Sequence, residues 1–186
     1  IPFNTWQFQN DMLDVFEDNR FSICKLPRQV GKTTTVGAYL LWKILFTDQY
    51  SVAVLANKRS QAIEILGRIQ LMYEHLPKWM QQGILEWNKG SIKLENGSEI
   101  IASSTSSSAI RGTSQNLIYC DEFAFVPNNI QEEFFTSVFP TISSGKSSKV
   151  IITSTPNGMN MFYKLWVDSE ENRNDYERVE IHWSDV

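Results

Sequence analysis

Residues 25–34 read KLPRQVGKTT and lie between a short apolar run, FSICKL, and a long apolar stretch over 33–46. A strand, a glycine-lysine-threonine turn and a helix in that order are typical of a phosphate-binding loop, whose backbone amides surround a polyphosphate. We expect Gly31 to allow close backbone approach, Lys32 to reach the β- and γ-phosphates, and the Thr33 hydroxyl to bind Mg²⁺. One departure needs explanation, because Leu26 stands where the pattern G-x-x-x-x-G-K-[ST] has its first glycine.

A second motif follows far along the chain, where LIYCDE ends a mostly apolar run in Asp121-Glu122. A buried strand that delivers two acids at its tip is typical of a Walker B motif. There Asp121 would hold Mg²⁺ through water, and Glu122 would polarise the attacking water as general base. A strand that stops at a solvated acidic turn would also produce this pattern. The phosphate-binding loop makes the Walker B interpretation the favoured one.

A third motif is VIITSTPNG, in which hydroxyl side chains crowd the end of an apolar run at Thr153, Ser154 and Thr155. Ligands of parallel sheets bind beyond the carboxyl ends of the strands. We therefore expect these hydroxyls to sense a γ-phosphate and to relay its loss. The alternative is an ordinary strand end before a Pro-Asn-Gly turn.

The order of these patterns predicts an α/β fold in one domain, a mainly parallel sheet flanked by helices. Period-two apolar patterns near 83–103, broken by Lys89-Gly90 and Asn96-Gly97, predict an antiparallel β-hairpin insertion. The remaining elements are expected as follows. Helices are expected over 9–18, 33–46, 59–75, 129–138 and 160–167, and strands over 21–26, 50–56, 116–122, 148–155 and 176–183.

Composition excludes several classes of protein. The net charge of −4 argues against unspecific coating of nucleic acid, although a local basic patch is compatible with it. Cys24 and Cys120 sit in apolar runs, which favours buried thiols in a reducing compartment, and two cysteines with two distant histidines do not make a zinc site. The longest apolar run, VGAYLLWKILF, is too short to span a membrane.

With these three motifs in order, the chain resembles the ATPase domain of the large terminase subunit of tailed bacteriophages, and most of all the terminases of large myoviruses. The fragments EWNKGSI, NGS, RG-x-S, FVPN, ISSG and STPNG recur at the spacing of that family. The family's phosphate-binding loop itself lacks the first glycine and carries Arg-Gln before x-Gly-Lys-Thr, as residues 28–33 do. The resemblance therefore implies a P-loop NTPase of the additional-catalytic-glutamate type, in which Leu26 is normal.

The resemblance also assigns roles to residues. It implies that ATP is bound by Gln9, Arg28, Gln29, Val30, Gly31, Lys32, Thr33 and Thr34, and Mg²⁺ by Thr33 and Asp121. It implies catalysis by Glu122, Lys32, Arg28 and Arg111, and coupling through Thr153, Ser154 and Thr155. Arg28 would stabilise the transition state in cis and Arg111 would be offered to a neighbouring subunit, and the sequence does not apportion the two. Gln9 is favoured over Gln7 for contact with adenine. The strand over 149–154 would lie between the P-loop strand and the Walker B strand.

The function implied is ATP-driven translocation of double-stranded DNA into a prohead. Its expected partners are double-stranded DNA, the portal protein, the small terminase subunit and further copies of the chain in a ring, in the host cell cytoplasm and without a membrane. We expect residues 1–186 to be a single ATPase domain of a longer chain, without the C-terminal nuclease domain and without DNA cleavage. Two alternatives stay open: a superfamily-2-type helicase, against which Phe123-Ala124 after Asp121-Glu122 counts, and a nucleotide-gated assembly module with little hydrolysis.

Overall fold

The computed structural model describes residues 4–105, 114–137, 140, 142 and 147–185. Within them, eight strands form one sheet in the order β3-β4-β5-β2-β6-β7-β1-β8. The strands are β1 (Phe21–Lys25), β2 (Ser51–Ala56), β3 (Ile84–Trp87), β4 (Ser91–Leu94), β5 (Glu99–Ser104), β6 (Leu117–Asp121), β7 (Lys149–Ser154) and β8 (Tyr176–Glu180). The helices are α1 (Gln7–Asp18), α2 (Lys32–Phe46), α3 (Arg59–Glu74), α4 (Asn128–Ser137) and α6 (Met161–Glu170). Short 3-10 segments are η1 (Lys78–Met80), η3 (Phe123–Phe125) and η4 (Trp183–Asp185).

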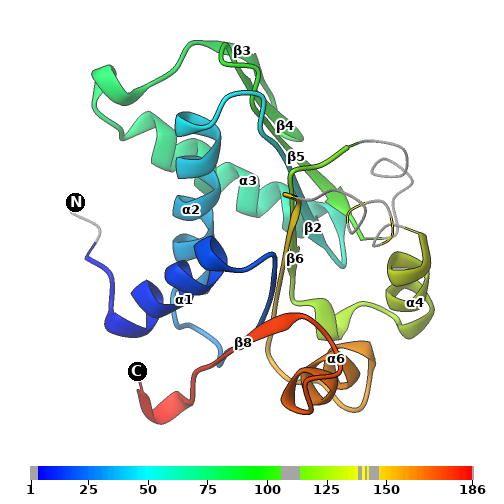
Figure 1. The fold of residues 1–186 in the computed structure, drawn as a ribbon. Helices are drawn as coiled ribbons and strands as arrows, with labels where there is room; N and C mark the ends of the chain where they lie inside the picture. Colours follow the sequence, from blue (N-terminus) through cyan, green and yellow to red (C-terminus); the bar gives the residue numbers. More distant parts are fainter. Residues whose placement is uncertain (1–3, 106–113, 138–139, 141, 143–146, 186) are drawn as a thin grey trace.

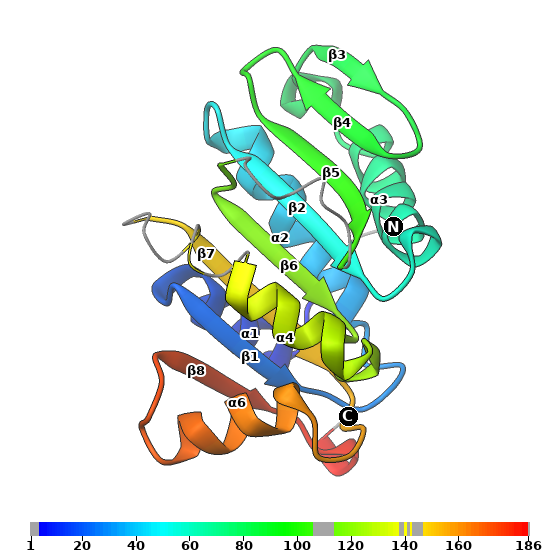
Figure 2. The same cartoon turned by 90° about the vertical axis from the view of Figure 1, so that its right-hand side faces the viewer.

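The sheet separates two hydrophobic cores, one under α1, α2 and α3 and the other under α4 and α6 (Figures 1 and 2). Side chains alternate between the two faces of a strand, and β6 follows this rule. Leu117 and Tyr119 belong to the first core, whereas Ile118 and Cys120 belong to the second. Helices on both faces of a parallel sheet require strands that are apolar throughout, and this explains the continuous apolar runs in the sequence.

From β5 to β8 every neighbouring pair of strands is parallel, whereas β3–β4 and β4–β5 are antiparallel. The predicted hairpin insertion near 83–103 is therefore confirmed. Its tight turn is at Asn96-Gly97, where Gly97 has a φ of +80° and the Asn96 side chain accepts a hydrogen bond from the amide of Ser98. The mainly parallel α/β fold with helices on both faces is confirmed as well.

Element boundaries differ from the prediction at the end of the chain. The last strand was expected to reach residue 183, but β8 ends at Glu180. Its only neighbour in the described sheet is β1, and the register pairs Glu180 with Lys25, the last residue of β1. The strand stops because its partner stops, and the chain continues into η4. None of the helices in the described parts of the chain has the length and apolar character needed to cross a membrane.

Candidate active site

The P-loop connects β1 to α2 by a turn that uses left-handed backbone conformations. Gln29 and Gly31 have φ values of +66° and +73°, and the carbonyl of Gly31 accepts the amides of Thr34 and Thr35, both at 3.0 Å. Leu26 still follows the strand, since its amide donates to the carbonyl of Ser154 at 3.1 Å and its side chain is buried in the core. The turn thus begins after Leu26, and no glycine is required at that position.

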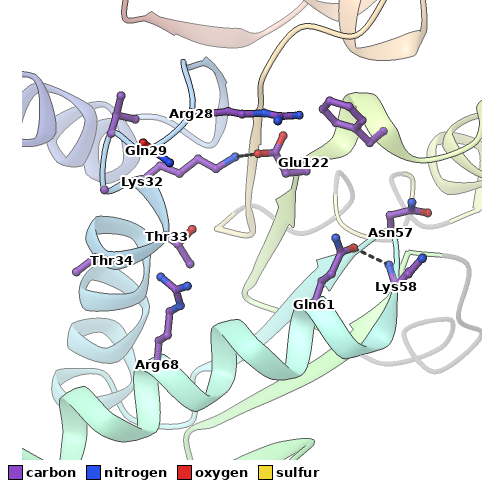
Figure 3. A pocket seen from close by; sticks show the side chains of 13 residues that line it. Arg28, Gln29, Lys32, Thr33, Thr34, Asn57, Lys58, Gln61, Arg68 and Glu122 are labelled. Carbon is purple, nitrogen blue, oxygen red and sulfur yellow. Dashed lines mark hydrogen bonds and ion pairs between the residues drawn. The ribbon is translucent and has the colours of Figure 1, made fainter. Parts of the chain in front are cut away.

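A pocket of about 590 Å³ opens beside this loop (Figure 3). Its walls come from the P-loop, the tip of β6 and the segment from the end of β2 into α3. The lining residues are Arg28, Gln29, Val30, Gly31, Lys32, Thr33, Thr34, Asn57, Lys58, Gln61, Arg68, Glu122 and Phe125. Four of these carry a positive charge and one a negative charge, which suits a polyanion such as a triphosphate.

Lys32 brings the P-loop and the Walker B tip together. Its ammonium forms an ion pair with Oε1 of Glu122 (Figure 3). The same ammonium lies 3.5 Å from Oδ1 of Asp121. The convergence follows from the sheet order, because β7 lies between β1 and β6 and all three strands are parallel. The predicted position of the strand over 149–154 is confirmed.

Glu122 is held on both of its carboxylate oxygens. Lys32 contacts Oε1, and Oε2 accepts hydrogen bonds from the amide and hydroxyl of Thr155 at 3.1 and 3.3 Å and from the hydroxyl of Ser154 at 3.3 Å. Burial alone would raise the pKa of Glu122, but the Lys32 ammonium and the Thr155 donors outweigh it and leave the pKa lowered. Glu122 also has a left-handed φ of +48°, an uncommon conformation for a residue with a side chain.

Asp121 is anchored through Oδ1, which accepts the Tyr119 hydroxyl at 2.7 Å and the Thr153 hydroxyl at 3.2 Å. Thr153 therefore contacts Asp121, whereas Ser154 and Thr155 contact Glu122, and their role in sensing a γ-phosphate stays a prediction. Tyr119 was missed by the sequence reasoning. Its signal was present in the sequence, because residues two apart on a strand share a face.

Gln9 lies next to the P-loop. It is buried, its amide nitrogen donates to the carbonyl of Val30 at 3.2 Å, and its amide oxygen accepts the amide of Trp6 at 3.0 Å. It therefore ties α1 to the loop and is not among the residues that line the pocket. Gln7 is exposed and donates to Asp11. Arg111 lies outside the described residues.

The sequence reasoning did not predict most of the residues in the opposite wall of the pocket. Asn57, Lys58, Gln61 and Arg68 follow the carboxyl end of β2 and face the P-loop side chains from α3 and the turn before it (Figure 3). The sequence offered a general signal only, since ligands of parallel sheets lie at this edge. Which side chains of a helix face the ligand depends on how the helix packs.

The oxygen donors at the site fit a magnesium ion that also binds phosphates. Mg²⁺ is usually held by one or two protein oxygens, several waters and substrate phosphates. Thr33 offers a hydroxyl in the pocket lining and Asp121 a carboxylate at the tip of β6. In the described parts of the chain, no cluster of three or more His, Cys, Asp or Glu residues is placed to hold a metal by itself.

Residues 23–184 match the family described as terminase large subunit, T4likevirus-type, N-terminal. The chain belongs to this family. Its fold is shared with solved structures of low sequence identity. The large terminase ATPase domain of Thermus phage P74-26 has 18% identity and a TM-score of 0.77, covering 96% of this chain and 81% of that one.

Two further phage proteins extend the comparison. The large terminase of bacteriophage HK97 has 22% identity and a TM-score of 0.76, covering 94% of this chain and 38% of that one. The large terminase of a thermophilic bacteriophage, solved in complex with ATP-γ-S, has 14% identity and a TM-score of 0.73, covering 99% of this chain and 46% of that one. This terminase-family chain thus spans less than half the length of those two large terminases.

Proposed function

We propose that this chain is the ATP-hydrolysing core of a viral DNA-packaging motor. The observation that carries the proposal is the convergence of Lys32, Asp121 and Glu122 at one cationic pocket beside the P-loop. Family membership supports the same conclusion, since the large terminase subunit is the ATPase of such motors. The phage structure solved with ATP-γ-S shows that the fold accepts a nucleotide in that relative.

In the proposed reaction, the triphosphate of ATP binds to the P-loop amides and to Lys32. Lys32 exchanges its contact with Glu122 for the β- and γ-phosphates, and Glu122 becomes available to polarise the attacking water. The amide and hydroxyl of Thr155 still donate to Glu122 after that exchange, and these bonds favour the ionised form that a base requires. Thr33 and Asp121 would hold Mg²⁺, which supplies neutralisation of the phosphate charge when bound.

Arg28 is the proposed cis arginine that stabilises charge in the transition state. It lines the pocket, and among the described residues it has no hydrogen bond or ion pair that would hold it elsewhere. Arg111 remains the proposed trans arginine. Gln9 is proposed to contact the adenine, which would require its amide to exchange its bonds to Trp6 and Val30.

Coupling would begin at the contacts between Glu122 and the end of β7. Because Thr155 and Ser154 donate to Glu122, a change at the γ-phosphate alters the environment of β7 directly. In the complete protein, that movement would drive double-stranded DNA into the prohead. We propose the portal protein, the small terminase subunit and other copies of the chain as partners, in the host cell cytoplasm.

The test compares Glu122→Gln with the parent and with Glu132→Gln, an exposed glutamate on α4. We expect Glu122→Gln to lower kcat by about 10²–10⁴-fold, the usual contribution of a general base, while ATP affinity changes little. Glu132→Gln should hydrolyse ATP like the parent. When the two substitutions are placed in the complete large subunit and assayed with proheads and DNA, only Glu122→Gln should abolish packaging.

Three results would contradict the proposal. Parental hydrolysis by Glu122→Gln would remove the assigned base. A parent chain that binds ATP and self-associates but does not hydrolyse it, even with proheads and DNA, would indicate an assembly module. Strand separation of duplex DNA would indicate a helicase, a fold neighbour represented by a DEAD-box protein from Methanococcus jannaschii at 13% identity and a TM-score of 0.58.

A further inference from the structure

Tyr119 is a buried polar residue to which the proposed reaction gives no role. Its side chain is fully buried in β6, two residues before Asp121 and on the same face of the sheet. Its hydroxyl donates to Oδ1 of Asp121 at 2.7 Å and lies 3.0 Å from the hydroxyl oxygen of Thr153. A phenol this close to the Asp121 carboxylate restricts the directions in which that carboxylate can point.

Thr153 closes a triangle with these two residues. The strand register places it directly opposite Asp121, and its hydroxyl donates to the same Oδ1 at 3.2 Å. A carboxylate oxygen can only accept, so the 2.7 Å contact makes the Tyr119 hydroxyl the donor to Asp121.

The hydroxyls of Tyr119 and Thr153 both donate to Oδ1 of Asp121, and neither donates to Oδ2. Among the described residues, Oδ2 of Asp121 accepts no hydrogen bond. The 2.7 Å bond from Tyr119 is the short one and the 3.2 Å bond from Thr153 is weaker, and together they hold Oδ1 in place and so restrict rotation of the carboxylate. Oδ2 is then left to a ligand that arrives with the nucleotide.

We propose that Tyr119 is a positioning residue that holds the Asp121 carboxylate in the orientation needed for Mg²⁺-nucleotide, and that it ties this carboxylate through Thr153 to β7. The inference rests on the proposed function, in which Asp121 holds the ion. It adds a structural link between the metal ligand and the strand whose end contacts Glu122. Groups that orient metal ligands commonly change metal affinity about 10–100-fold when removed.

Packing is the competing explanation, because Tyr119 fills a large volume in the core. The substitution Tyr119→Phe separates the two, since it keeps the ring and removes only the hydroxyl. Tyr39→Phe is the matched control. Tyr39 is also buried, its hydroxyl also lies 3.1 Å from a carboxylate oxygen, that of Glu17, and it is not among the residues that line the pocket.

The experiment titrates Mg²⁺ into the chain with a fluorescent ADP as the probe, so that no hydrolysis is needed. For Tyr119→Phe, we expect the Mg²⁺ concentration at half-maximal binding to rise about tenfold. Binding of the probe in EDTA should be unchanged. Thr153→Val should give a smaller shift in the same direction, and the shifts of the two variants should not add because they act on one oxygen. Tyr39→Phe should titrate like the parent.

Each of the other outcomes would contradict the inference, and the outcomes differ in what they mean for the proposed function. A parental Mg²⁺ dependence in Tyr119→Phe removes this inference and leaves the proposed function standing. An equal shift in Tyr39→Phe shows a general loss of packing and also removes it. If Tyr119→Phe does not fold, Thr153→Val decides, and a parental titration there counts against the inference. A parent whose nucleotide binding ignores Mg²⁺ removes the inference, whereas the hydrolysis assay with Glu122→Gln decides the proposed function.

Discussion

The strand tips at β1, β6 and β7 and the hairpin at the far side of the sheet are built in opposite ways. At the tips, polar side chains are bonded to one another, as Asp121 is to the buried Tyr119 and Thr153. At the edge, β3 pairs only with β4 in the described sheet, and Leu85 is 61% exposed. The difference teaches that the chemistry depends on a small interlocked region, whereas the hairpin contributes mainly to the sheet itself.

The largest expected effect is on the rate of ATP hydrolysis, and it distinguishes Arg28 at the pocket from Lys93 on the hairpin. Arg28→Ala should lower the rate of ATP hydrolysis by about 10³–10⁵-fold, the range for an arginine that stabilises the transition state. Lys93→Ala, on β4, should leave the rate unchanged. Steady-state hydrolysis of both variants checks this. A loss of less than about tenfold for Arg28→Ala would assign that stabilisation to another arginine.

The next effect concerns pH and the ion pair at the tips. Since the pKa of Glu122 is lowered below its ordinary 4.5, its contribution to stability is complete above that pH and is lost as the pH falls through the lowered value. Lys32→Met removes the pairing. The unfolding free energy of this variant should be about 1.5–3 kcal/mol lower than that of the parent at neutral pH. The difference between the two should become smaller below about pH 4.5.

Urea unfolding at several pH values measures this gap. Lys43→Met serves as control, because Lys43 pairs with Glu17 on a surface away from the pocket. Its difference from the parent should be smaller than that of Lys32→Met at neutral pH, since its partner is more exposed. A gap for Lys32→Met that does not change with pH would show that Glu122 does not titrate as described.

Two glycines with left-handed φ values allow a direct comparison of the regions. Gly31→Ala and Gly97→Ala should each cost about 1–2 kcal/mol of stability, because φ is +73° and +80° at these positions. A Cβ atom at Gly31 would also lie 2.9 Å from the Gln9 amide nitrogen. Only Gly31→Ala should weaken nucleotide binding. Thermal unfolding and probe affinity measure both, and equal loss of affinity in Gly97→Ala would refute the separation of the two regions.

The smallest expected effect is on the exposed hairpin. Leu85→Ser should change the unfolding free energy by no more than about 0.5 kcal/mol, as is usual for exposed positions. Ile92→Ala on the adjacent strand should cost about 2–5 kcal/mol, because Ile92 is buried. Chemical denaturation of both variants checks the contrast. A large loss for Leu85→Ser would mean that the hairpin surface contributes more to stability than its exposure indicates.

The sequence was most informative where local pattern and chemistry coincide. Gly31-Lys32-Thr33, Asp121-Glu122 and the hydroxyls after β7 could be recognised because each stands at the end of an apolar run, and Asn96-Gly97 because it demands a tight turn. Parallel pairing then brings strand ends to one edge. The position of β7 between β1 and β6 came from the family resemblance.

Other features depend on contacts that no local pattern contains. Tyr119 reads as a core residue until the pairing of Asp121 with Thr153 is known, and Arg68 reads as a surface residue until α3 is placed across the pocket from the P-loop. Gln9 was chosen for adenine, but its bonds to Trp6 and Val30 appear only in three dimensions. The end of β8 was set by the length of β1.

The position of β7 also determines the distance between β1 and β6. Neighbouring strands are about 4.8 Å apart, so one intervening strand separates β1 from β6 by about 10 Å. Because β7 fills this interval within the sheet, a ligand between the P-loop and Glu122 has to lie beyond the strand tips, where the pocket opens. Lys32, at the start of α2, contacts Glu122 across that opening.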